Sequence, residues 1–191
     1  MLALRELSVA SGGYRILGGV SIDLYEGEIL LVTGRSGSGK TTLLRAVAGI
    51  AKELLGLEVE GRVQVCGEKA LKPENVAKYV FYVPQEPWFS ISCPYPVYEL
   101  LSYTSRTLEE VAKALRELGI ENKLWDSSTN LSGGEAQRIA LAEAMLSEKK
   151  LVLVDEVTSY LDAESRRKAV SIVKKLADQG IAVVIVDHDV A

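Results

Sequence analysis

One segment constrains the fold of this 191-residue chain more than any other: Gly34 to Thr41 reads GRSGSGKT and fits the pattern G-x-x-x-x-G-K-[ST]. An apolar run from Ile29 to Thr33 precedes it, and residues 39–50 are typical of a helix. Glycines let backbone N–H groups curl round phosphate oxygens, and a helix start adds its positive dipole end. Lys40 supplies a point charge, and the Thr41 hydroxyl suits Mg²⁺. The sequence therefore predicts a nucleoside triphosphate site made of Gly34, Arg35, Ser36, Gly37, Ser38, Gly39, Lys40, Thr41 and Thr42.

Two adjacent acids supply the complementary half of such a site. The segment Lys150 to Val154 contains four apolar residues and predicts a central strand that delivers Asp155 at its carboxyl end, where open α/β sheets bind ligands. A carboxylate at that edge can hold Mg²⁺, and Glu156 next to it can polarise a water for attack on the γ-phosphate. Alone, two acids at a strand end would be a solvated turn. Combined with the phosphate loop, they predict a metal ligand and a general base.

Strands and helices alternate along most of the chain. Residues 2–33 hold β-type runs separated by the glycine pairs at 12–13 and 18–19, and Gly61 to Cys66 returns to strand. The last third predicts a helix from Asp162 to Ala177 and a strand from Ile181 to Val186. Apolar strands that alternate with amphipathic helices predict a mostly parallel sheet with both faces covered, which is the α/β class.

The middle of the chain, roughly 97–147, changes character to helix. Thr107 and Glu110 have the spacing of a capping box at the start of a helix. Gly119 is a suitable residue to end that helix. We therefore expect a helical insertion in the α/β core.

Composition limits the partners. The chain is 48% hydrophobic and 25% charged with a net charge of −4, and this acidic balance disfavours nucleic acid as a direct partner. No apolar run approaches the roughly 18 residues of a membrane span, and the N-terminus lacks the regions of a signal peptide. We expect a cytoplasmic protein whose membrane role, if any, comes through a separate partner.

The segment Leu131-Ser132-Gly133-Gly134-Glu135, followed by Gln137-Arg138, distinguishes among phosphate-loop proteins. Ser132 and Glu135 form a capping box, but that role does not explain two glycines in a first helical turn, each costing up to about 1 kcal/mol. A bare helix N-terminus would suit a second phosphate site. Here the sequence resembles the nucleotide-binding domain of ABC ATPases over essentially its whole length. The resemblance implies that Ser132, Gly133, Gly134 and Glu135 bind the γ-phosphate of ATP held by an opposite subunit, in a head-to-tail dimer.

Further positions match the family in order. Tyr14, 26 residues before Lys40, matches an aromatic that stacks on adenine. Gln85 matches the glutamine that senses Mg²⁺ and water, and the stretch 159–162 matches a loop that crosses the dimer interface. His188, the only histidine, lies 32 residues after Glu156 and matches the switch histidine that contacts the γ-phosphate. Tyr14 could instead be a surface tyrosine, and a lone histidine after a strand is usually structural.

Three departures from the family pattern concern residues near the catalytic groups. Val157 stands where a proline is usual, Tyr160 where alanine is common, and Asp187 precedes the histidine in place of threonine. None removes a catalytic group, although Asp187 could favour a protonated His188. The chain ends three residues after His188, where family members usually continue, so we expect a shortened chain or a minimal domain.

The resemblance implies one domain over residues 1–191: a P-loop NTPase core with a mostly parallel sheet, an N-terminal antiparallel β region and a helical subdomain over about 86–147. It implies ATP hydrolysis with Mg²⁺, with Lys40, Gln85, Glu156 and His188 as catalytic groups and Thr41, Gln85 and Asp155 as metal groups. The implied partners are a second nucleotide-binding domain and a membrane-spanning transporter subunit on the inner face of the cell membrane.

Alternatives remain at this point. Aromatic residues after Gln85 (Trp88, Phe89, Tyr95 and Tyr98) would either form a groove for the membrane subunit or pack within the helical subdomain. A soluble translation- or repair-related ABC ATPase shares the same catalytic residues, and a nucleotide-gated scaffold would bind ATP with little turnover. Asn122-Lys123-Leu124-Trp125 fails the base-reading motif of a GTPase. The transported cargo, the direction of transport and the choice between homodimer and heterodimer are not encoded in these motifs.

Overall fold

The computed structural model describes residues 1–69, 72–102, 104–156 and 161–187. Its contacts divide the chain into two compact units. Unit 1 contains residues 1–82, 149–155 and 177–191, and unit 2 contains residues 83–148 and 156–176. Each unit is described on its own below.

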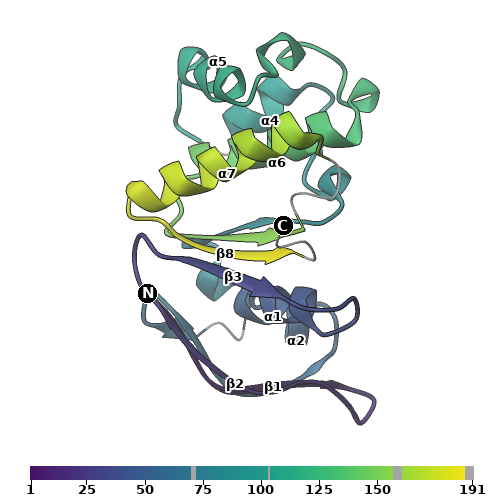
Figure 1. Cartoon of the computed structure of the whole chain (residues 1–191), viewed down its shortest axis with the longest axis vertical. Helices are drawn as coiled ribbons and strands as arrows, with labels where there is room; N and C mark the ends of the chain where they lie inside the picture. Colours follow the sequence, from purple (N-terminus) through teal and green to yellow (C-terminus); the bar gives the residue numbers. More distant parts are fainter. Residues whose placement is uncertain (70–71, 103, 157–160, 188–191) are drawn as a thin grey trace. The chain divides into compact units, whose positions relative to one another are not determined.

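Unit 1 contains two four-stranded sheets. The first has the strand order β2-β1-β4-β5 and is antiparallel, and its strands are β1 (Leu2–Ser11), β2 (Tyr14–Leu24), β4 (Glu58–Val65) and β5 (Glu68–Lys69). The second has the order β3-β8-β7-β6, and its strands are β3 (Ile29–Thr33), β6 (Val80–Val83), β7 (Leu151–Asp155) and β8 (Ala182–Asp187). In this second sheet β8 pairs in parallel with both β3 and β7, and Figure 1 shows β3 and β8 side by side.

Three short helices complete unit 1: α1 (Lys40–Val47), α2 (Ile50–Glu53) and α3 (Pro73–Val76). The helix α1 contacts strands of both sheets, and its apolar residues Leu43, Leu44 and Val47 are buried in a shared core. Strand β7 is buried at every position, as expected for a central strand covered on both faces. The predicted α/β class, with a parallel sheet and an N-terminal antiparallel region, is confirmed.

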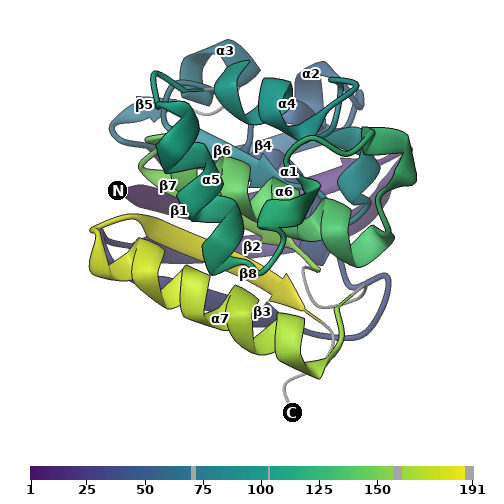
Figure 2. The same cartoon turned by 90° about the horizontal axis from the view of Figure 1, so that it is seen from above.

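Unit 2 is mainly helical. Its longer helices are α4 (Pro96–Ser102), α5 (Leu108–Glu117), α6 (Gly133–Leu146) and most of α7 (Ala163–Asp178), joined by the 3-10 turns η1 (Pro87–Phe89), η2 (Glu121–Lys123) and η3 (Ser128–Asn130). Figure 2 shows α5 next to α6, and the two helices are in contact. Both predicted capping boxes are present, and Gly119 follows α5 with a left-handed φ of 70°. The predicted subdomain 86–147 falls within unit 2, which also takes in residues 156–176.

Two local predictions were wrong. Gly18 and Gly19 do not end a strand, because β2 runs through them with a change of register and Gly19 N–H donates to Ser8 Oγ at 3.0 Å. The predicted helix 39–50 divides in two at Gly49. Gly49 has a φ of 75°, and a Cβ there would lie 2.9 Å from the Lys72 carbonyl carbon, so the close approach of another segment ends α1.

Candidate active site

The phosphate loop connects β3 to α1 in unit 1. Lys40 is buried, and its Nζ donates to the carbonyl oxygens of Gly34 at 2.8 Å and Arg35 at 3.1 Å. Ser38 N–H also donates to the Arg35 carbonyl, at 3.2 Å. The loop is therefore curled round its own lysine ammonium, the group that the sequence predicts to meet the phosphates. Arg35, Ser36 and Ser38 are exposed in the loop, and Thr42 lies in the first turn of α1.

Glycine is required where the loop meets β2. Gly39 has a φ of 90°, and a Cβ there would lie 2.8 Å from Leu17 Cδ2 and 3.0 Å from the Ile16 carbonyl oxygen. Strand β2 therefore runs directly against the loop. Tyr14 begins the same strand two residues before Ile16, and it is 83% exposed. This exposure leaves the Tyr14 ring open to stack on a ligand.

Thr41 and Asp155, two of the residues predicted to bind the metal, lie together. Thr41 Oγ1 donates to Asp155 Oδ1 at 3.0 Å, from the start of α1 to the carboxyl end of β7. Asp155 is buried, and its second oxygen, Oδ2, accepts from Tyr82 Oη of strand β6 at 2.7 Å. The sequence predicted Thr41 and Asp155 as neighbours, but it missed Tyr82. A tyrosine in an apolar strand carries no signal that separates it from a core residue.

The Tyr82 phenol is held in its protonated form. Burial raises its pKa, and the neighbouring Asp155 carboxylate raises it further, whereas Arg45 acts in the opposite direction. The Tyr82 hydroxyl therefore keeps its proton and donates it to Asp155 throughout the physiological pH range.

The oxygen atoms of Thr41 and Asp155 in unit 1 are suitable ligands for magnesium. A hydroxyl has one proton and two lone pairs, so Thr41 can donate to Asp155 and still offer its oxygen to a cation. Mg²⁺ binds through one or two carboxylates together with substrate phosphates, and Thr41 with Asp155 beside a phosphate loop is such a set. In the part of the chain that the structure describes, no group of three or more His, Cys, Asp or Glu side chains could hold a metal alone.

Glu156, the predicted base, is buried in unit 2 with a φ of 52°, in the left-handed region that a non-glycine residue seldom adopts. Its Oε2 accepts from Gln85 Nε2 at 2.7 Å. Two predicted site residues are thus brought together although they lie far apart in sequence. An amide nitrogen does not bind a cation, so through this atom Gln85 acts on the glutamate.

Ser132 caps helix α6 in unit 2. Its backbone N–H donates to Glu135 Oε2 at 2.8 Å, and Glu135 N–H donates to Ser132 Oγ at 3.3 Å. Glu135 also pairs with Lys123 at 3.2 Å, and the hydrogen bond from the Ser132 backbone is the first cause that lowers its pKa. Gly133 and Gly134 form the first turn of the helix. Ser132 Oγ also donates to Glu135 Oε2 at 2.9 Å, so the cap engages both the Glu135 carboxylate and the Ser132 hydroxyl. The backbone of the glycine turn is left as the part that can face a ligand.

Two further predictions concern residues outside the structure's described part. His188 and residues 159–160 of the stretch 159–162 lie there, and the roles of His188 and of this stretch stay predictions.

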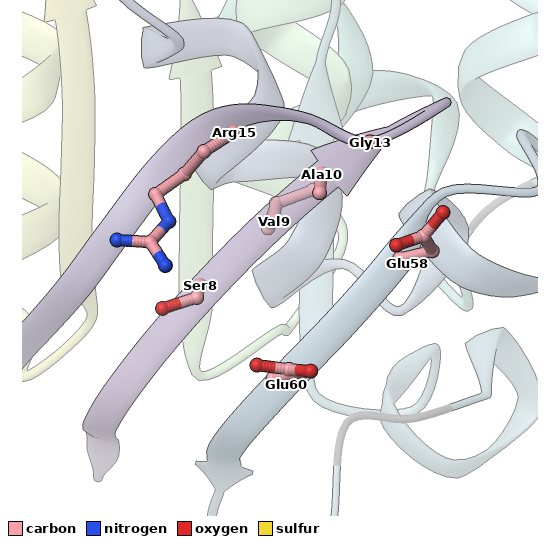
Figure 3. Close-up of a pocket in the computed structure, with 7 residues that line it drawn as sticks. All are labelled: Ser8, Val9, Ala10, Gly13, Arg15, Glu58 and Glu60. Carbon is pink, nitrogen blue, oxygen red and sulfur yellow. The ribbon is translucent and has the colours of Figure 1, made fainter.

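Two grooves accompany the site residues. In unit 1 a shallow groove of about 170 Å³ is lined by Ser8, Val9, Ala10, Gly13, Arg15, Glu58 and Glu60. Figure 3 shows that they come from three neighbouring strands of the antiparallel sheet, apart from Gly13, which lies in the turn between β1 and β2. Tyr14 is not among the residues that line this groove, although its neighbour Arg15 is. In unit 2 a more open groove of about 420 Å³ is lined by Trp88, Ile91, Ser92, Cys93, Pro94, Ser128 and Thr129.

None of the helices in the described ranges is both long and apolar enough to cross a membrane.

Comparison with known proteins identifies the family. A sequence profile of the family described as ABC transporter matches residues 17–159, so the chain belongs to that family of ATP-binding domains. The resemblance seen in the sequence is confirmed.

Particular relatives agree with this assignment. The chain is 34% identical to the zinc import ATP-binding protein ZnuC 2 of Aliivibrio fischeri, over 99% of this chain and 73% of that protein. It is 32% identical to an uncharacterized ABC transporter ATP-binding protein of Methanocaldococcus jannaschii, over 100% of this chain and 68% of that protein. The dimeric ATP-binding cassette MJ0796 bound to ADP and Pi matches with a TM-score of 0.84 and 25% identity, over 100% of this chain and 89% of that one.

Some relatives are much longer. The chain spans 34% of an ABC transporter ATP-binding protein of Saccharolobus solfataricus and 41% of one from Clostridium tetani, with 31% and 32% identity.

Proposed function

We propose that this chain binds and hydrolyses Mg²⁺·ATP and powers membrane transport through ATP-driven pairing of two such domains. The observation that carries the proposal is the 3.0 Å contact of Thr41 with Asp155 beside a loop curled round Lys40. This arrangement lies in a chain of the ABC transporter family, and a structural relative is a dimeric cassette in a post-hydrolysis state.

The chain's own residues would work by positioning and charge. Loop N–H groups and the Lys40 ammonium would exchange their contacts with carbonyl oxygens for the phosphates, and Tyr14 would stack on the adenine. Mg²⁺, when bound, neutralises charge on the phosphates, and Thr41 and Asp155 would hold it. Glu156 would accept a proton from the attacking water, with its carboxylate held in place by Gln85. His188 would contact the γ-phosphate.

The remaining group would come from a second copy or a close relative. The helix start of α6 at Gly133 presents backbone N–H groups suited to the γ-phosphate of an opposite subunit. The Ser132 hydroxyl, which donates to Glu135 in this structure, would turn to the same phosphate. Pairing would therefore complete each site, and one chain alone would bind ATP but hydrolyse it poorly.

The decisive experiment is Glu156→Gln. This change keeps the side-chain volume and the bond with Gln85 possible but removes the base. We expect the rate of ATP turnover to fall about 100-fold or more. ATP should then accumulate on a dimer that is visible by gel filtration, whereas wild-type chain should elute mostly as a monomer after hydrolysis. Normal turnover in Glu156→Gln would remove this residue from the base role.

The aromatic residues of unit 2 support a membrane-subunit partner. Phe89 is 85% exposed next to Trp88, which lines the 420 Å³ groove. Tyr98 contacts both Tyr95 and Trp125 edge to face, with ring centroids 5.9 and 6.5 Å apart. Large exposed aromatics beside a groove are typical of binding sites for another protein. We propose that a cytoplasmic segment of a transmembrane subunit docks here, which would hold the chain at the inner face of the membrane.

This docking can be tested separately from catalysis. Phe89→Ser removes exposed aromatic surface and should release the chain from the membrane fraction of cells that express it with its transporter. ATPase activity of the purified chain should stay unchanged. Tyr25→Ser is a matched control, because Tyr25 is 62% exposed but belongs to unit 1. Retention of Phe89→Ser on membranes would exclude this surface.

A further inference from the structure

Tyr82 holds one oxygen of the carboxylate that the proposed function assigns to magnesium. Its Oη donates to Asp155 Oδ2 at 2.7 Å, while Thr41 Oγ1 donates to Oδ1 at 3.0 Å. Each oxygen of a buried carboxylate therefore has its own donor, one from β6 and the other from α1. Rotation of the carboxylate about its own axis would break both bonds.

We propose that Tyr82 is a positioning residue for the metal: it fixes the orientation of the Asp155 carboxylate and so keeps Oδ1 on the side of Thr41, where Mg²⁺ would bind. The inference rests on the proposed function, because it concerns the metal of that site. Partners that hydrogen-bond to metal-ligating carboxylates commonly change metal affinity 10- to 100-fold when removed.

The surroundings of Tyr82 keep its hydroxyl in place. The ring is half-buried against the core of unit 1. The hydrogen bond from Tyr82 supports the carboxylate from strand β6, while the one from Thr41 supports it from helix α1. A phenylalanine would fill the same volume as Tyr82 but could not make this hydrogen bond.

Tyr82→Phe removes only the hydroxyl, and its ring keeps the packing. With the bond lost, the Asp155 carboxylate gains rotational freedom that metal binding must then remove. We expect Mg²⁺ affinity to fall by about 10-fold or more. Nucleotide affinity without metal should stay unchanged, because the phosphate loop is untouched.

The test measures metal binding apart from turnover. A fluorescent ATP analogue is first bound to the purified chain in EDTA, which gives the metal-free affinity. Mg²⁺ is then titrated in excess of the EDTA, and the free Mg²⁺ concentration at half of the fluorescence change is taken as the Mg²⁺ midpoint. Direct binding of Mn²⁺ to the chain with ATP is followed by electron paramagnetic resonance. Tyr79→Phe is the matched control: Tyr79 is also half-buried against the core of unit 1, but its ring lies against the Lys78 ammonium, 4.9 Å from its centroid.

A raised Mg²⁺ midpoint in Tyr82→Phe, with metal-free binding and the Tyr79→Phe control both unchanged, would support the proposal. An unchanged Mg²⁺ midpoint would overturn it, and so would an equal loss of metal-free and Mg²⁺-dependent binding, which a purely structural role produces. Failure of the wild-type chain to bind nucleotide at all would instead contradict the proposed function.

Discussion

Gln85 Nε2 donates to Glu156 Oε2 at 2.7 Å, so the two residues that the sequence separates by most of the helical region meet through one hydrogen bond. Glu156 is buried, and a buried carboxylate without a donor would cost more than one that accepts a hydrogen bond. Gln85 therefore holds one oxygen of the Glu156 carboxylate in a fixed orientation.

Gln85→Ala tests this link. Loss of the donor should leave Glu156 poorly oriented, and we expect turnover to fall about 10- to 100-fold with ATP affinity nearly unchanged. Gln179→Ala is the control, because Gln179 is exposed near the end of α7. Steady-state ATPase kinetics separate the two effects. Equal loss of binding and turnover would mean that Gln85 serves the nucleotide and not the glutamate.

Two helix caps of the same type allow an effect on stability to be distinguished from an effect on catalysis. Ser132 and Thr107 each form a capping box in unit 2, with Glu135 and Glu110 respectively. Alanine at either position should cost about 1 kcal/mol of stability. Only Ser132→Ala should abolish ATP hydrolysis, because only Ser132 is proposed to reach a nucleotide. Thermal melts and ATPase assays on both variants check this.

Mixing variants tests whether the site is shared between copies. Lys40→Ala and Ser132→Ala should each be inactive alone. In a head-to-tail dimer of one of each, one site keeps both residues, so an equal mixture should recover about a quarter of wild-type turnover. Mixtures that stay inactive at concentrations where dimers form would argue against completion in trans.

A buried pair of acids predicts a pH effect on stability. Glu143 and Glu99 are both buried; burial, and then the Glu99 charge, raise the pKa of Glu143 to about 8 from its ordinary 4.5. In the folded chain Glu143 keeps its proton at neutral pH, while in the unfolded chain it is ionised. Unfolding then releases a proton, so this contribution to stability is complete below pH 4.5 and is lost as the pH rises toward 8.

Glu143→Gln should remove that dependence. The wild-type free energy of unfolding should fall by about 1 kcal/mol per pH unit across this window, and the variant should show a flatter profile and greater stability at pH 9. Glu109→Gln, at an exposed position on α5, should leave the slope intact. Urea unfolding midpoints between pH 5 and pH 9 measure both. Parallel profiles for wild type and Glu143→Gln would contradict the assignment.

The loop glycines differ in what they contact. Gly39 has backbone and side-chain atoms of β2 within 3.0 Å of an added Cβ, whereas Gly37, with a φ of 77°, has open space. Both alanine variants pay left-handed strain of about 1–2 kcal/mol, but only Gly39→Ala must also displace β2. We expect it to weaken nucleotide binding about tenfold more than Gly37→Ala does, as measured by fluorescence titration.

Sequence reasoning found what depends on local spacing. The phosphate loop, both capping boxes and the strand that carries Asp155 follow from short patterns whose geometry is set within a few residues. It failed where distant segments meet. Gly49 ends α1 because Lys72 approaches it, and Gly19 stays inside β2 because Ser8 on the next strand accepts its N–H. Tyr82 was missed for the same reason, since its partner Asp155 is supplied by another strand.

Strand β3, which leads into the phosphate loop, is the least enclosed strand of its sheet. Among the strands described it pairs only with β8, and Ile29 and Leu31 are 42% and 46% exposed, while β7 is buried throughout. At every second residue of β3 the amide N–H faces away from β8. These amide hydrogens should exchange with deuterated solvent faster than those of β7. The proposed phosphate loop is thus attached to an edge strand, which we expect to open more readily than β7. Nucleotide binding should slow this exchange, and the slowing would extend backward along β3.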